Sequence, residues 1–197
     1  FKAKHTINAE NKIISPGFID VHTHDDDNVF LDPSMSSKIS QGVTTCVAGN
    51  CGISLAPFSY NGEVPAPIAL LGKSEVFRFP RVSDYKEEFN NKPSSVNLAL
   101  LTGHSMLRVE AMNGEFARPA TTKEISKMVD KLKLALEDGS IGLSTGLAYP
   151  AANDAPTSEI IELAKILPEF DGIFTTHMRN EAVDAVSYTH LRAHETR

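Results

Sequence analysis

Five short apolar segments, rich in β-branched residues, recur along the chain and end in glycine or polar residues. We predict a β-strand at each of them, at residues 17–21, 43–48, 96–101, 140–145 and 172–176. Most of the intervals carry helical signals. The clearest is residues 121–138, where a capping-box pair precedes apolar residues spaced three and four apart. Strands that alternate with helices are typical of a parallel sheet. The predicted fold class is therefore α/β.

Polar and glycine-rich residues gather after the predicted C-terminal ends of these strands. A TIM-type (β/α)8 barrel carries its active site at that end, and it needs about 250 residues. This chain has 197 residues. We therefore predict a partial barrel over residues 15–186, with about five of the eight strands. Its first strand, at residues 18–21, is expected to be buried on both faces. The proline-rich residues 54–80 are expected to lie outside the core.

Charge and composition exclude several classes of protein. The formal net charge is −6 at pH 7, which disfavours a nucleic-acid partner because phosphate contacts need clustered positive charge. No run of about 18 apolar residues is present, so the sequence predicts neither a membrane span nor a membrane partner. The chain has two cysteines, and residues 1–10 show no signal-peptide pattern. We therefore expect reduced thiols and a cytoplasmic localisation.

Histidine and cysteine residues follow three of the predicted strands. His22 and His24 stand two apart at the end of the first strand, so strand alternation would turn both imidazoles to one face. Cys51 lies in Gly-Asn-Cys-Gly after the second strand, and His177 ends the fifth. Imidazole and thiolate donors suit Zn²⁺ better than Mg²⁺ or Ca²⁺. These four residues are the predicted metal ligands. Cys51 has an alternative interpretation as a nucleophile with a lowered pKa.

Other polar residues near the strand ends keep two interpretations. His104, after the third strand, could hydrogen-bond a substrate, or it could be a structural histidine. Arg179 could bind a substrate carboxylate through its planar guanidinium group, or it could pair with Glu181. Asp26 and Asp27 could support the ligating imidazoles, but they are more simply explained as a solvated acidic loop.

Five motifs occur in order along the chain. They are Pro-Gly-Phe-Ile-Asp-Val-His-Thr-His-Asp-Asp at 16–26, Gly-Val-Thr-Thr and Gly-Asn-Cys-Gly-Ile-Ser within 42–54, Gly-His-Ser and Leu-Arg within 103–108, Gly-Leu-Ser-Thr-Gly-Leu-Ala-Tyr-Pro at 142–150, and Thr-His-Met-Arg-Asn-Glu at 176–181. In this combination the chain resembles the N-acyl-D-amino-acid deacylases, the D-aminoacylase group of the amidohydrolase superfamily. The resemblance runs from about residue 13 to residue 185.

This resemblance implies a zinc-dependent enzyme that hydrolyses the amide bond of a small-molecule N-acyl-D-amino acid. The products would be a carboxylic acid and a D-amino acid. The resemblance implies that His22 and His24 hold one metal position, that Cys51 bridges to a second, and that His177 binds the second, tighter zinc. One tight zinc site with a second, weaker one is therefore expected. The loop with Ala148 and Tyr149 resembles the family's substrate-lining segment.

The resemblance also implies catalytic and metal-binding residues that are not found among these 197 residues. The family's next zinc histidine and its general acid and base aspartate have no counterpart here, so we predict little or no activity for the chain by itself. Residues 1–14 are expected to be a remnant of the family's N-terminal β-sandwich. Residues 187–197 resemble translated read-through of a sequencing adapter and are expected to be a non-native tail. The open edges of a partial barrel predict self-association.

Two other functions stand as alternatives. Another amidohydrolase, of the hydantoinase or dihydroorotase type, would carry a metal-bridging lysine at the end of the fourth strand. The sequence there is Ser144-Thr145-Gly146, without a lysine. A non-catalytic zinc-binding fragment would hold its zinc in a closed site, whereas a catalytic site keeps an open position.

Overall fold

A computed structural model describes residues 3–182 and 185. Its centre is a parallel sheet in which β1 pairs with β2, β2 with β5, β6 with β7 and β7 with β8. These strands span Phe18–Asp20 (β1), Val43–Ala48 (β2), Asn97–Leu100 (β5), Thr102–Gly103 (β6), Gly142–Gly146 (β7) and Ile173–His177 (β8). Each predicted strand is therefore present and parallel to its neighbours, which confirms the α/β class.

The third predicted strand, at residues 96–101, corresponds to β5, and β6 continues it by two residues that the prediction did not include. Leu101, the single residue between them, donates its N–H to Ala48 O and so extends the pairing with β2. On the other side, Ile141 N donates to Leu100 O, just before β7 begins. The two halves of the sheet are joined along this line. The backbone just after β2 lies so close to Leu101 that only glycine fits at position 49, because a Cβ on Gly49 would lie 2.1 Å from Leu101 O.

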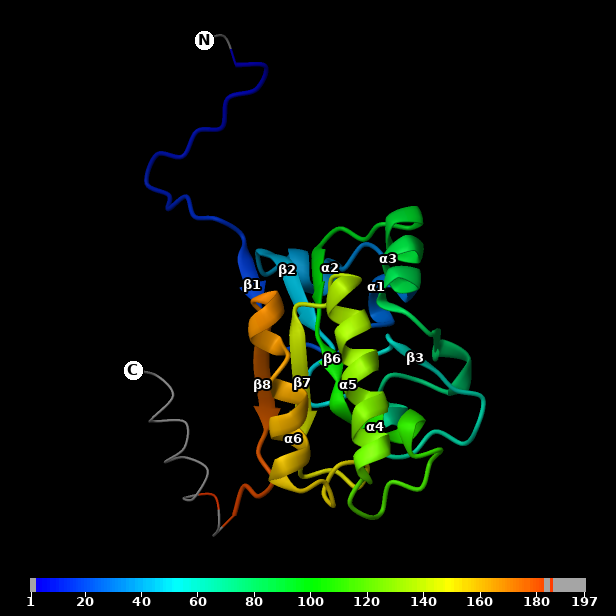
Figure 1. Cartoon of the computed structure of the whole chain (residues 1–197). Helices are drawn as coiled ribbons and strands as arrows, with labels where there is room; N and C mark the ends of the chain where they lie inside the picture. The colour runs from blue at the N-terminus through cyan, green and yellow to red at the C-terminus, as the bar shows by residue number, and fades with distance from the viewer. Residues whose placement is uncertain (1–2, 183–184, 186–197) are drawn as a thin grey trace.

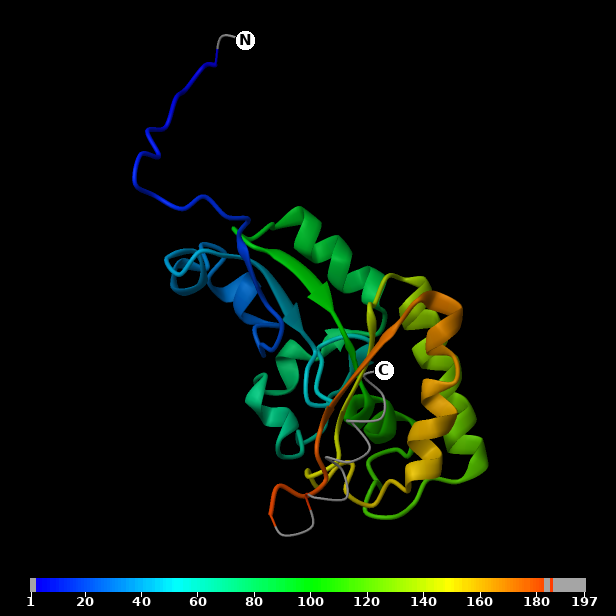
Figure 2. The ribbon, with the colours of Figure 1, turned by 90° about the vertical axis from the view of Figure 1, so that its left-hand side faces the viewer.

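Helices occupy the intervals between the strands. They span Asn28–Leu31 (α1), Ser36–Ile39 (α2), Val82–Asn91 (α3), His104–Ala111 (α4), Thr122–Glu137 (α5) and Thr157–Ala164 (α6), with a 3-10 helix at Leu167–Phe170. α5 and α6 pack against each other on the same side of β6, β7 and β8 (Figures 1 and 2). The predicted capping box starts α5, where Thr121 Oγ1 accepts from Glu124 N and the Glu124 carboxylate accepts from Thr121 N.

The expectation that residues 54–80 lie outside the core is wrong. This segment forms an antiparallel ribbon, β3 (Phe58–Ser59) with β4 (Arg78–Phe79), and two 3-10 helices, Ile68–Leu70 and Ser74–Val76. Phe58, Ile68 and Phe77 are buried in the same apolar cluster as residues of β2 and β5. The prolines interrupt the regular spacing of apolar residues that would predict a helix or a strand, but these apolar side chains are still buried in this cluster. A second cluster lies between α4, α5 and α6.

The expectation that the first strand is buried on both faces is also wrong. Phe18 and Ile19 are each 61% exposed, because β1 is an edge strand whose only partner among the described residues is β2. Ile173 and Phe174 of β8, at the opposite edge, are also exposed. Apolar strands with one open side fit the predicted tendency to self-associate, which stays a prediction.

The described N-terminal residues, 3–17, add no strand to this fold. No strand is assigned within residues 3–17, so the sandwich remnant expected at residues 1–14 stays a prediction. The tail at residues 187–197 lies outside the described residues. Among the helices of the described ranges, none combines the length and the apolar character needed to cross a membrane.

Candidate metal centre

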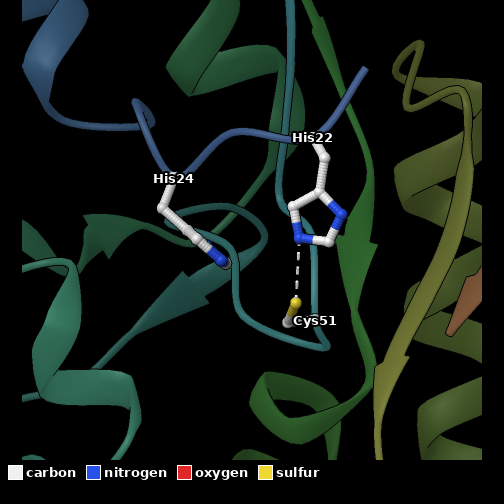
Figure 3. A group of neighbouring side chains, drawn as sticks. All are labelled: His22, His24 and Cys51. Atoms are coloured by element: carbon white, nitrogen blue, oxygen red, sulfur yellow. Dashed lines mark hydrogen bonds between the residues drawn. The ribbon is translucent and has the colours of Figure 1, made fainter. Parts of the chain in front are cut away.

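His22 and His24 lie just beyond β1 and face the same space, as strand alternation predicts. Between them, Thr23 is buried, and its N–H and hydroxyl both donate to Val47 O of β2. The chain bends at His22, just beyond β1, and the two bonds to Val47 O fix Thr23 to β2 between the two imidazoles. Their ring centroids are 5.8 Å apart, and both rings lie near Cys51 (Figure 3).

Cys51 meets these histidines from the turn that follows β2. The Nε2 atom of His22 is 3.1 Å from Cys51 Sγ. One ligand atom from each of His22, His24 and Cys51 lies within 4.8 Å of the others. Residues that are 29 positions apart in the chain are thus brought within the span of one metal ion.

His177, at the end of β8, approaches Cys51 as well. Its Nδ1 is 3.8 Å from Cys51 Sγ and 3.1 Å from Tyr149 Oη, and its Nε2 is 3.0 Å from Glu181 Oε1. A cavity of about 260 Å³ is lined by residues of β2 and β8 and of the segments that follow β1 and β2, including His22, Cys51 and His177. The Sγ atom of Cys51 is therefore close both to His22, which follows β1, and to His177 of β8.

Burial acts on the protonation of two of these donors, His24 and Cys51. Burial lowers the pKa of His24, which favours the neutral imidazole that binds metals. Burial raises the pKa of the Cys51 thiol, whereas an activated cysteine nucleophile needs a lowered pKa. In this environment the thiolate requires a nearby cation, and a nitrogen and sulfur donor set matches zinc.

The residues predicted to touch substrate fall in different places. Tyr149 follows β7 and packs against His177, with ring centroids 4.9 Å apart, and neighbouring Ala148 is exposed. His104 is fully buried, and its Nε2 is 2.8 Å from Glu159 Oε1. This burial favours the structural interpretation of His104 over direct contact with a substrate.

Arg179 does not pair with Glu181, because no ion pair among the described residues joins them. Its guanidinium group donates to the backbone carbonyls of Asn153 and Ala155 instead. The sequence offers no signal for these bonds, because backbone acceptors are not encoded by residue type. Arg179 therefore fastens the loop before α6 to the end of β8.

The expectation of a solvated acidic loop at Asp26 and Asp27 is wrong, since both are buried. The Asp26 carboxylate accepts from Gly49 N and from Leu55 N, each at 3.3 Å. Burial raises the pKa of Asp26 to about 7. Three successive aspartates give no local sign of burial, which comes from contacts with residues more than 20 positions away.

The preceding acidic residues are held by a lysine. Lys38 Nζ lies 2.8 Å from Asp20 Oδ2 and 3.0 Å from Asp25 Oδ2. The hydrogen bond from Lys38 lowers the pKa of Asp20. These two carboxylates are therefore engaged by Lys38, on either side of the His22 and His24 segment.

Comparison with known proteins gives concordant matches. The model of the amidohydrolase family matches residues 5–179. The curated D-aminoacylase of Alcaligenes xylosoxydans xylosoxydans is 45% identical over 186 residues, which are 94% of this chain and 38% of that protein. A crystal structure of D-aminoacylase matches with a TM-score of 0.85 and 47% identity, over 89% of this chain and 36% of that one.

A second solved structure carries ligands. It is an N-acyl-D-glutamate deacylase from Bordetella bronchiseptica, complexed with zinc and a phosphonate inhibitor that mimics the tetrahedral intermediate. It matches with a TM-score of 0.81 and 42% identity, over 88% of this chain and 36% of that one. The chain thus spans a little over a third of the length of these relatives.

Proposed function

The chain belongs to the amidohydrolase family, and on this premise we propose that it carries metal-binding strand ends of a zinc-dependent N-acyl-D-amino-acid deacylase. The reaction is hydrolysis of the acyl amide, which releases a carboxylic acid and a D-amino acid. The observation that carries the proposal is the convergence of His22, Cys51 and His177 from three parallel strands on one cavity. The similarity to D-aminoacylase supports the choice of substrate class.

In this proposal the parallel sheet is about five strands of a TIM-type barrel. The order β1, β2, β5 with β6, β7 and β8 follows the order of the chain, as in a barrel. The candidate ligands lie at or just beyond the C-terminal ends of β1, β2 and β8, where barrel enzymes carry their active sites. Residues 1–14 would belong to an accompanying β-sandwich.

The residues have distinct roles toward zinc. His22 and His24 would hold one position, Cys51 would be shared, and His177 would complete the second, tighter position. The 3.1 Å and 3.8 Å separations of Cys51 Sγ from His22 and His177 support sulfur as the shared donor. When bound, zinc polarises a carbonyl group and lowers the pKa of water. The zinc in the related glutamate deacylase supports this choice of metal.

Tyr149 and Ala148 would lie on the substrate side of the site. The Tyr149 hydroxyl, 3.1 Å from His177 Nδ1, holds that ring beside Cys51. The small, exposed Ala148 leaves room for a D-side chain. The aspartate that would move protons in the family has no counterpart in these residues, so we expect the chain alone to be inactive.

Zinc titration of the metal-free chain tests the site. We expect saturable binding that weakens by at least tenfold in Cys51→Ser and in His22→Ala. The control is His5→Ala, which removes an exposed histidine of the N-terminal segment and should leave binding unchanged. Equal binding by Cys51→Ser and the unsubstituted chain would contradict the proposed site.

An assay of the zinc-loaded chain with N-acetyl-D-amino acids and their L-enantiomers tests the activity. We expect no turnover of either. Turnover of the D-enantiomers that is lost in His177→Ala would overturn the expected inactivity and support the substrate class. Turnover of only the L-enantiomers would contradict the proposed function.

A further inference from the structure

The turn that presents Cys51 has an unusual backbone. Ile53 N donates to Asn50 O at 3.0 Å, so residues 50–53 form a tight turn. Its central residues, Cys51 and Gly52, have φ values of +54° and +75°. Positive φ at both central positions is the pattern of a type I′ turn, which favours glycine or asparagine. A cysteine adopts this conformation only where surrounding contacts hold it.

Ser144 of β7 holds this turn from one side. Its hydroxyl accepts a hydrogen bond from Gly52 N at 3.0 Å and donates one to Gly49 O. The side chain is completely buried. One oxygen therefore joins the two ends of the segment that contains Cys51, and it fixes this segment to the strand that precedes Tyr149.

Asp26 holds the same segment from another side. Its two carboxylate oxygens accept from Gly49 N and Leu55 N, so it spans both flanks of the turn. Its own backbone is anchored, because the Tyr85 hydroxyl donates to Asp26 O at 2.6 Å. Asp26 also lies two residues after His24, which ties the position of the Cys51 turn to the histidine segment.

We propose that Ser144 and Asp26 are positioning residues that clamp residues 49–55 so that Cys51 Sγ faces His22 and His177. Removal of the Ser144 hydroxyl leaves Gly52 N and Gly49 O without this partner, and the turn can then relax toward negative φ at Cys51. Such a change swings the thiol away from the imidazoles. The inference rests on the proposed role of Cys51 as a zinc ligand.

Alkylation of Cys51 by iodoacetamide, followed by peptide mass spectrometry, measures this clamp. Mass spectrometry separates Cys51 from the fully buried Cys46. In the metal-free chain Cys51 is 5% exposed, so we expect slow alkylation. We expect alkylation of Cys51 to be at least tenfold faster in Ser144→Ala than in the unsubstituted chain. We also expect Ser144→Ala to need at least tenfold more Zn²⁺ for the same protection of Cys51 from alkylation. Asp26→Asn should shift both quantities in the same direction.

The matched control is Ser140→Ala. Ser140 is also a buried serine, four residues before Ser144, but its hydroxyl bonds to Thr102, Leu100 and Gly142 and not to the Cys51 turn. We expect its alkylation rate and zinc protection to match those of the unsubstituted chain. Ser144→Thr, which retains the hydroxyl, should restore slow alkylation. Circular dichroism establishes whether each variant is folded. If Ser144→Ala is unfolded, the alkylation rate of Asp26→Asn tests the clamp instead.

The outcomes distinguish the role of Cys51 as a zinc ligand from the clamp formed by Ser144 and Asp26. If zinc fails to protect Cys51 in the unsubstituted chain, the proposed ligand role fails, while the metal-free rates still test the clamp. If zinc protects the unsubstituted chain but Ser144→Ala and Asp26→Asn behave identically to it, the clamp is refuted. Equal acceleration in Ser140→Ala would also refute it, because the effect would then be general loosening.

Discussion

Glu159 is predicted to be the residue of α6 whose charge matters most for stability. It is fully buried, and Arg108 Nη1 donates to both of its oxygens at 2.6 Å. The rest of the guanidinium group donates to the backbone carbonyls of Ala151, Phe116 and Arg118. No other carboxylate among the described residues pairs with Arg108. Glu159→Gln therefore leaves a buried guanidinium charge without its counter-ion.

The expected loss is about 3–5 kcal/mol, the cost of removing one partner from a buried ion pair. With a urea m value of about 2 kcal/mol/M, the unfolding midpoint should fall by about 2 M. The control is Glu162→Gln, on the same helix, whose partner Lys165 and own side chain are both at least half exposed. Exposed pairs contribute little, so its midpoint should hardly move. Equal shifts for Glu159→Gln and Glu162→Gln would show that the buried ion pair contributes no more to stability than the exposed one.

Three further predictions concern pH, a helix cap and zinc. Burial lowers the pKa of His104 in the folded chain. As the pH falls below about 6.5, His104 therefore takes up a proton more readily in the unfolded chain, and the free energy of unfolding should fall. His104→Gln should flatten the dependence of the melting temperature on pH between pH 7.5 and 5.5, and an unchanged slope would count against this. Thr121→Ala removes the cap of α5 and should cost about 1 kcal/mol in urea unfolding, whereas no loss would mean that the cap contributes nothing. Zinc at about 100 times its dissociation constant should stabilise the chain by about 2.7 kcal/mol in thermal melts, and persistence of the full effect in Cys51→Ser would contradict sulfur ligation.

The strands and the candidate ligands could be predicted from sequence because their signals are local. β-branched runs such as residues 43–48 indicate strands by themselves, and the two-residue spacing of His22 and His24 sets a common face. Parallel strands also bring their C-terminal ends to one edge. That rule placed Cys51 and His177 near the first histidines without any knowledge of tertiary contacts.

The contacts that hold these ligands could not be predicted in the same way. Asp26 lies in a run of three aspartates, and its burial depends on Gly49, Leu55 and Tyr85, which are 23 to 59 positions away. His104 is hydrogen-bonded to Glu159, which lies 55 positions along the chain. Such pairings depend on how the helices and loops pack, which residue type and spacing do not encode.

The exposure of β1 has a related cause. An apolar run such as residues 18–21 indicates a strand, but burial depends on what lies on each side. Among the described residues β1 has one neighbouring strand, so Phe18 and Ile19 stay exposed. Residues 54–80 show the reverse case. Their apolar side chains lack periodicity, yet several of them are buried in one cluster with residues of β2 and β5.

X-ray absorption at the zinc edge identifies the atoms around the metal and so measures whether Cys51 and the histidines bind zinc together. We expect a sulfur shell at about 2.3 Å and imidazole nitrogens at about 2.0–2.1 Å from zinc. The sulfur shell should vanish in Cys51→Ser, while the imidazole scattering of His22, His24 and His177 remains. A zinc-loaded chain with only nitrogen and oxygen neighbours around zinc, or with a sulfur shell that survives Cys51→Ser, would show that Cys51 is not a zinc ligand.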